Sequence, residues 1–233
     1  MEKVQLSRLV NHNNPRAMLE EVKKIFLYTY SPKSFTKIEK AFENTLLLFK
    51  GKHNGYLACN TEYHDLTHTL DAFLACARLM DGRNLSGDPF PVTLATNLLL
   101  ATLLHDTGYI QKTDDNKGTG AKYTTNHVER SIDFVKNNRS DFQVNDAELE
   151  NICTFIACTG IKNRWEDFDF ADKDHSTAGA ILATADLLGQ MSDRAYLEKL
   201  LFLYYEFKEA GIEGFNTEFD ILRKTLEFYE MTQ

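Results

Sequence analysis

The sequence predicts an all-α fold, a single-domain bundle of helices. Apolar residues recur at three- and four-residue spacing along nearly the whole chain, which is typical of amphipathic helices. Alternating apolar and polar runs bounded by tight turns, which indicate strands, are absent from the sequence. With 233 residues, 43% of them hydrophobic, the chain is long enough to bury one large core, and we expect a single domain over residues 1–233.

Four helices are predicted in the first half by apolar periodicity and by residues that begin or end helices. Ser31-Pro32 separates the first two, because proline cannot continue a helix. Asp81-Gly82 ends the third, and Pro91 introduces the fourth, which is apolar on most faces and is therefore expected at the centre of the core. The predicted ranges are residues 16–30, 34–49, about 64–81 and 92–105.

The second half is predicted to continue in the same way. Asn126 is suited to cap a helix that starts at His127. Residues 51–60 and 165–174 are expected to be loops, the second of them acidic and solvated. Residues 111–125 are polar without an apolar period, and both a lid beside the site and an inert solvated loop remain open. The later helices are predicted at residues 147–158, 176–191, 195–210 and 218–231.

Composition and charge exclude several classes of protein. The net charge of −8 argues against binding along duplex nucleic acid, which needs a basic face, although a bound metal can still attract a small anion. Four cysteines without a CxxC pair indicate reduced thiols in a cytoplasmic protein. The N-terminus has no apolar signal segment, and the longest apolar stretch, residues 92–104, is shorter than the roughly 20 residues of a membrane span.

Three separated motifs indicate a metal site: Tyr63-His64-x-x-x-His68, His105-Asp106 and Asp186. Imidazole and carboxylate are suited to divalent first-row metals. His64 and His68 share one face if their helix begins at or before His64. His105 and Asp106 can bind one ion only where their helix ends or distorts, and Gly108 supplies such an end.

Each motif also has a structural interpretation. Histidines on an apolar helix can be hydrogen-bonded members of a core. Asp186 lies in the apolar run Ala183-Thr184-Ala185-Asp186-Leu187, where a buried carboxylate needs a cation or strong donors, and a lysine or arginine from elsewhere could serve. The joint occurrence of the three motifs favours the metal site.

The order His, His-Asp, Asp resembles the HD-domain superfamily of metal-dependent phosphohydrolases, an all-helical fold, over about residues 61–191. Residues 1–60 and 192–233 would then be flanking helices packed on this core. The Tyr63-His64-x-x-x-His68 element is similar to the cyclic nucleotide phosphodiesterase branch and its small bacterial relatives. The resemblance implies a metal bound by four residues, and it implies that His64 protonates the leaving oxygen. Those four ligands are His68, His105, Asp106 and Asp186.

Further roles follow from the same resemblance. His127 is similar to a downstream histidine that binds a second metal or the phosphate, and Glu129 competes with it for that role. Asp106 or Asp186 would orient the attacking water. That branch often has a histidine where this chain has Tyr109, which puts a second metal in question. Phosphate could also be held by basic residues that are otherwise ordinary surface charges: Lys122, Arg130 and Lys162.

The expected function is therefore a metal-dependent phosphohydrolase acting on a small, nucleotide-like phosphomonoester or phosphodiester. The ion would be Mn, Fe, Ni, Zn, Co or Mg, and one or two ions are open. Two alternatives use the same fold: a di-iron oxygenase, and a catalytically silent module that binds a nucleotide or metal. A homodimer is also open, and no membrane partner is expected.

Overall fold

The computed structural model describes residues 10–193 and 195–231, and over these residues the prediction of an all-α bundle is confirmed. Extended pairing in the described part is limited to two isolated bridges, Lys50–Ala58 and Tyr56–Lys112. The α-helices described are α1 (Pro15–Leu27), α2 (Pro32–Phe49), α3 (Leu66–Leu85), α4 (Val92–Leu104), α5 (His127–Asn138), α6 (Asp146–Ala157), α7 (Lys173–Met191), α8 (Tyr196–Glu209) and α9 (Glu218–Met231). Short 3-10 helices are η2 (Thr107–Tyr109), η3 (Gly120–Tyr123) and η4 (Trp165–Asp167).

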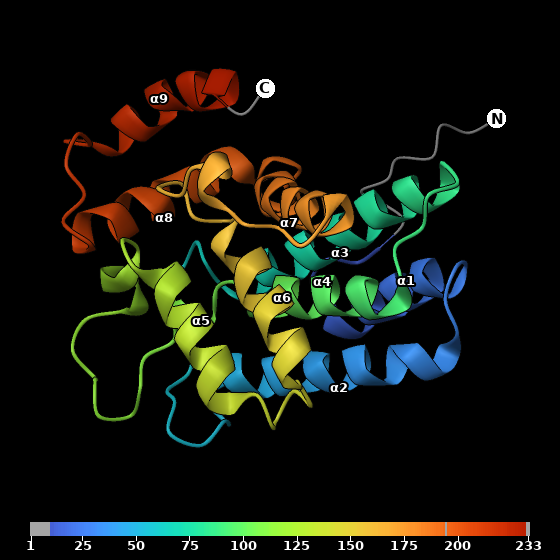
Figure 1. Ribbon diagram of the computed structural model, residues 1–233. Coiled ribbons are helices and arrows are strands. Elements are labelled where there is room, and N and C mark those ends of the chain that lie inside the picture. The colour runs from blue at the N-terminus through green and yellow to red at the C-terminus, as the bar shows by residue number, and fades with distance from the viewer. Residues whose placement is uncertain (1–9, 194, 232–233) are drawn as a thin grey trace.

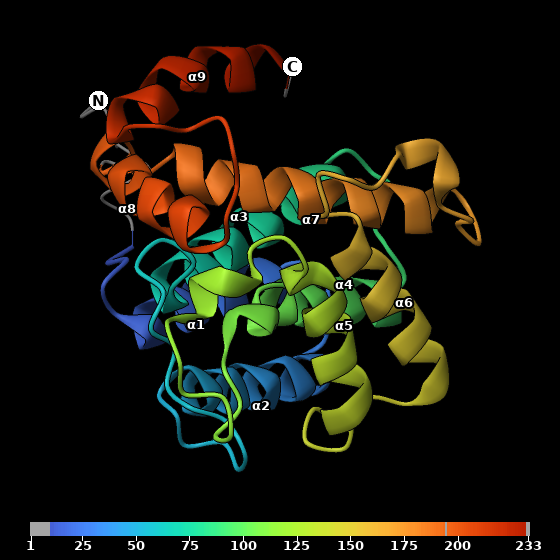
Figure 2. The ribbon, with the colours of Figure 1, turned by 90° about the vertical axis from the view of Figure 1, so that its left-hand side faces the viewer.

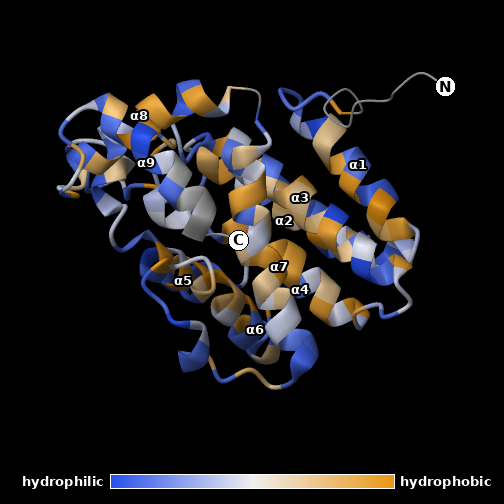
Figure 3. Ribbon diagram, turned by 90° about the horizontal axis from the view of Figure 1, so that it is seen from above, coloured by the Kyte–Doolittle hydropathy of each residue, from blue (hydrophilic) through white to orange (hydrophobic). Residues whose placement is uncertain are grey.

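Helix α4 is the centre of the bundle. It contacts α2, α3, α6 and α7, and Figure 1 shows it between α2 below and α7 above. Each residue from Leu94 to Leu104 is buried, as expected for a helix that is apolar on most faces. In Figure 3 hydrophobic colour appears on α4 and α7 and on parts of α1 and α8, while the loops at the rim are mostly hydrophilic.

The helices before and after this centre are attached differently. Helix α1 packs on α3 and α2 on α4, and both contribute to the main hydrophobic core. Helices α8 and α9 pack on each other around a second, smaller apolar cluster, to which Tyr63 also belongs. Figures 1 and 2 both place α9 on the outside of the molecule, over α8. The C-terminal pair is thus joined to the main core through few elements.

Helix α3 starts later than its sequence pattern predicts. Its first residue is Leu66, because Asp65 is extended and its carboxylate accepts a hydrogen bond from the backbone N–H of His68 at 2.9 Å. The helix also runs on to Leu85, past Gly82. The helix thus starts two residues after the predicted start near His64, and His64 lies in the segment before it.

Residues 111–125 form an ordered loop around η3. Thr119 caps η3, and its backbone N–H and hydroxyl donate to Glu209 of α8. Asn126, predicted to cap α5, makes no capping hydrogen bond through its side chain. Among the described residues, no helix combines the length and hydropathy that crossing a membrane requires.

Candidate metal centre

Four side chains from three distant segments meet beside the C-terminal end of α4. Asp106 Oδ2 lies 3.1 Å from His68 Nε2 and 3.3 Å from His105 Nε2. Asp186 Oδ1 lies 3.0 Å from His68 Nε2 and 3.5 Å from His105 Nε2. His68, His105 and Asp106 each offer an atom within 4.8 Å of the others, and all three residues are buried. The four residues that the resemblance assigns to one ion therefore lie together.

The end of α4 brings its two consecutive residues to one place. His105 is the C-cap and keeps helical backbone angles, whereas Asp106 leaves them with φ −106° and ψ 9°. The Nδ1 of His105 donates to the carbonyl of Thr102 at 2.7 Å, which leaves Nε2 to face the cluster as an acceptor in the neutral ring. This is the helix end that the His-Asp pair requires.

Gly108 is required here because there is no room for a side chain, and its backbone is not left-handed. A Cβ at Gly108 would lie 1.9 Å from the carbonyl oxygen of His127, so only glycine lets α5 approach so closely. The hydroxyl of Ser131 in α5 accepts from the Gly108 N–H at 2.8 Å and donates to the His105 carbonyl at 2.5 Å. The turn after α4 and the start of α5 are thus locked together.

Three buried atoms of the cluster lack a hydrogen-bond partner among the described residues: His68 Nε2, His105 Nε2 and Asp106 Oδ2. Their contacts are short enough for ion pairs, but they do not have hydrogen-bond geometry. Buried polar atoms without partners are costly, and metal coordination satisfies such atoms. Two imidazole nitrogens and two carboxylates are also a donor set suited to a divalent first-row ion, so these residues fit a metal.

The pKa shifts of the four cluster residues also favour a bound cation. Burial lowers the pKa of His68, but contact with Asp106 and Asp186 outweighs burial and raises it to about 9. The same opposition of burial and carboxylate charge leaves the pKa of His105 well above its ordinary value. Burial alone would raise the pKa of Asp106 and Asp186, yet the imidazoles lower both. The carboxylates thus favour positive charge on the imidazoles, and a divalent cation at the same place would supply positive charge to the same carboxylates.

A second group of side chains borders the cluster. The Nδ1 of His64 donates to Oε2 of Glu206 at 2.6 Å, and the other oxygen of Glu206 accepts from the backbone N–H of Tyr63 at 2.7 Å. The hydroxyl of Tyr109 lies 3.4 Å from His64 Nε2. The rings of His64, Tyr109 and His127 stack, with centroids 4.3 and 4.6 Å apart.

His127 reaches the cluster from the start of α5. Its Nε2 lies 3.9 Å from Asp106 Oδ1, and its Nδ1 donates to the carbonyl of Thr124 at 2.8 Å. Burial is the main cause that lowers the pKa of His127. The ring is therefore neutral near pH 7, and Nε2 faces Asp106 as an acceptor.

The other candidates for phosphate or a second metal lie elsewhere. Lys122 donates to Asp115 and to the carbonyl of Lys117, both at 2.6 Å. Arg130 donates to the Gly108 and Ile110 carbonyls and stacks 3.4 Å from the Tyr123 ring centroid. These two cations hold the 111–125 loop and its attachment to α5. Glu129 is exposed, and the amine of Lys162 donates to the carbonyl of Thr125.

Sequence reasoning missed Glu206. It is 4% exposed and approaches His64 from α8, 142 residues away along the chain. The available signal was a carboxylate between Tyr205 and Phe207 in a helix rich in aromatic residues. That signal does not name the partner, because the partner is set by how α8 packs.

Comparison with known proteins gives one match. The sequence model of a family described as Npun_R2479-like matches residues 112–232, slightly more than half of the chain. The matched part contains His127, Asp186 and Glu206, whereas His64, His68, His105 and Asp106 precede it. No curated protein and no solved structure matches.

Proposed function

The chain belongs to the Npun_R2479-like family, and we propose from its buried cluster that it is a metal-dependent phosphohydrolase of the HD type. The observation that carries the proposal is the convergence of His68, His105, Asp106 and Asp186, with three of their atoms buried and unpaired. The substrate is a small phosphomonoester or phosphodiester, for which a nucleotide is the expected type.

The cluster would hold the ion through two neutral imidazoles and two carboxylates. When bound, a divalent ion of this kind lowers the pKa of a coordinated water and offsets charge on phosphate oxygens. Asp186 is 17% exposed at its side chain, whereas His105 is fully buried. The open side of the centre is therefore near Asp186, and we place the phosphate there.

His64 is the proposed proton donor to the leaving oxygen. Glu206 holds its Nδ1, so the ring is oriented and Nε2 is directed toward Tyr109 and the rings beside the cluster. A carboxylate behind an imidazole stabilises the imidazolium form, which can transfer its Nε2 proton as the phosphorus–oxygen bond breaks. Tyr109 is buried, and burial raises the pKa of its hydroxyl well above 10, so it stays a neutral hydrogen-bonding neighbour.

His127 is assigned to a water or a second ion in preference to the phosphate. With Nδ1 donating to Thr124, the neutral ring has only a lone pair to offer at Nε2. A phosphate oxygen also brings lone pairs, whereas a water or a cation is complementary to that nitrogen. Asp106 Oδ1, 3.9 Å away, would share the same guest.

The decisive experiment combines elemental analysis of the purified protein with a phosphatase and phosphodiesterase panel in Mn, Mg, Ni, Zn and Fe. Asp106→Ala should lose metal and activity, whereas His64→Ala should keep the metal and lose turnover. His175→Ala is the matched control and should behave as wild type, because this histidine pairs with Asp172 at the start of α7 and not with the cluster. Equal activity in all four proteins, or oxygen consumption without phosphate release, would contradict the proposal.

A further inference from the structure

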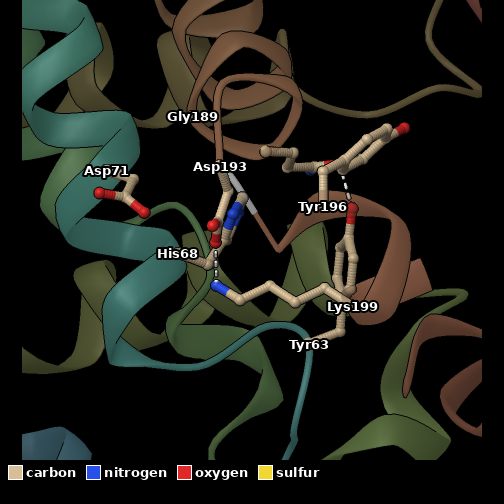
Figure 4. A pocket seen from close by; sticks show the side chains of 8 residues that line it. Tyr63, His68, Asp71, Gly189, Asp193, Tyr196 and Lys199 are labelled. Atoms are coloured by element: carbon tan, nitrogen blue, oxygen red, sulfur yellow. Dashed lines mark hydrogen bonds and ion pairs between the residues drawn. The ribbon is translucent and has the colours of Figure 1, made fainter. Parts of the chain in front are cut away.

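A small pocket, lined mainly by residues with polar or charged side chains, lies against His68. It is lined from α3 by His68 and Asp71, from the end of α7 by Gly189 and Gln190, and from the following segment and α8 by Asp193 and Lys199, with Tyr63 and Tyr196 completing it. Figure 4 shows side chains of these elements gathered around it. The space open to the centre of a water-sized sphere is about 10 Å³, which suits about one water molecule.

The pocket has charged walls that are already organised. Lys199 Nζ lies 2.6 Å from Asp193 Oδ2, and this pair is drawn as a dashed line in Figure 4. Asp71 Oδ1 lies 2.5 Å from His12 Nδ1, and the side chain of Asp71 is 9% exposed. The second oxygen of Asp71 makes no hydrogen bond that the described residues show. The pocket therefore offers a carboxylate oxygen three residues beyond His68, on the same face of α3, as an acceptor for a water.

His68 differs from the other histidines of the site in how its ring is held. The Nδ1 atoms of His64, His105 and His127 all donate to an oxygen of the protein. His68 Nε2 faces Asp106 and Asp186, so its Nδ1 is directed away from them, and among the described residues no hydrogen bond to that Nδ1 is found. A histidine that binds a metal nearly always donates its other N–H to a carboxylate, a carbonyl or a water.

We propose that one water in this pocket accepts from His68 Nδ1 and donates to the Asp71 carboxylate, and that Asp71 thereby positions His68 for the metal. Lys199 and Asp193 bound the water on its other side. The inference rests on the proposed metal centre, and it makes Asp71 a positioning residue that touches neither the ion nor the substrate.

A crystal structure of the wild-type protein with Mn²⁺ tests the water directly. We expect an ordered water within hydrogen-bond distance of both His68 Nδ1 and an Asp71 oxygen. A dry pocket, or an Nδ1 that donates to a protein atom, overturns the inference. This measurement does not depend on any variant folding.

Metal affinity tests the consequence, with free Mn²⁺ followed by electron paramagnetic resonance. Asp71→Leu should weaken Mn²⁺ binding by about 10- to 100-fold, and Asp71→Asn, which keeps an acceptor oxygen, should recover most of that loss. His12→Leu is the matched control, because it breaks the same ion pair but keeps the carboxylate, and its affinity should stay near wild type. If Asp71→Leu binds like wild type, the inference fails alone. If wild type binds no Mn²⁺, the metal centre fails and the inference fails with it.

Discussion

Two of the places where buried polar side-chain atoms of the described residues lack hydrogen-bond partners differ in kind. One is the cluster of His68, His105 and Asp106, and the other is Asn97 in the middle of α4, whose amide nitrogen and oxygen are both unpaired. Asn97 and His105 are both 0% exposed. Burial and missing partners are therefore common to both places.

The difference lies in charge and convergence. Asn97 is neutral and brings both a donor and an acceptor from one residue, so nothing about it selects a cation. The cluster brings ionisable groups from α3, the end of α4 and α7 to one point. An unpaired polar atom alone thus indicates only a cost in stability, whereas several ionisable groups that share one vertex indicate a ligand.

The largest expected effect is on metal-dependent stability. Wild type at a metal concentration about 1,000 times the dissociation constant should gain about 4 kcal/mol in its free energy of unfolding. His105→Ala should abolish that gain, whereas Asn97→Val should keep it in full. Chemical unfolding with and without a chelator measures both. A similar metal response in the two variants would remove the distinction between the two places.

A smaller effect is expected from Glu206, the hydrogen-bond partner of the proposed proton donor His64. Glu206→Gln should lower kcat by about 10- to 100-fold, because an amide stabilises the imidazolium of His64 less than a carboxylate does. Metal content should not change, since Glu206 lies outside the ligand cluster. Steady-state kinetics with elemental analysis separates the two readouts. Loss of metal in this variant would show that Glu206 acts on the fold of the centre.

The pH dependence should separate the cluster from Asn97 as well. The pKa of His68 is raised to about 9 in the folded protein, so its protonation stabilises the metal-free fold fully below pH 6.5, and this contribution is lost as pH rises through about 9. Metal must displace that proton, so affinity should rise by about tenfold per pH unit for each proton released. Calorimetry in buffers of different ionisation enthalpy counts the protons. A pH-independent affinity from 6 to 8 would contradict the assignment of His68.

The smallest effect is expected at Asn97. Replacing it by valine, the apolar residue nearest in size, removes two unpaired polar atoms and should raise the free energy of unfolding by about 1 kcal/mol. Thermal unfolding of the metal-free protein measures it. A loss of stability or of activity would mean that the amide has a partner or a role of its own.

The helices could be predicted closely because apolar spacing and helix-ending residues are local properties. The prediction for α9 agrees with the structure at both ends, and α2 and α4 agree within two residues. The start of α3 lies two residues after the predicted position, because the cap at Asp65 places His64 outside the helix. Local sequence signals predict that a helix is present more accurately than they predict the residue at which it begins.

Some residues of the candidate site could likewise be predicted from the sequence, and others could not. The His-Asp pair at a helix end and Asp186 in an apolar run could be selected from sequence, because buried charge in such places needs a reason. Lys122 and Arg130 were offered for phosphate, yet both are engaged in holding the 111–125 loop. Glu206 could not be assigned, because its partner is set by the packing of α8, which is distant in sequence from His64. Asp71 could not be assigned, because its ion-pair partner His12 lies 59 residues earlier in the chain.

The position of Glu206 on α8 has a consequence for control of the protein. Because α8 and α9 have their own small apolar cluster, the proposed proton donor His64 is held by a helix outside the main hydrophobic core. If a binding partner or a modification displaced α8 and α9, we expect turnover to be lost while the metal stays bound. Turnover would return when α8 and α9 packed back against His64.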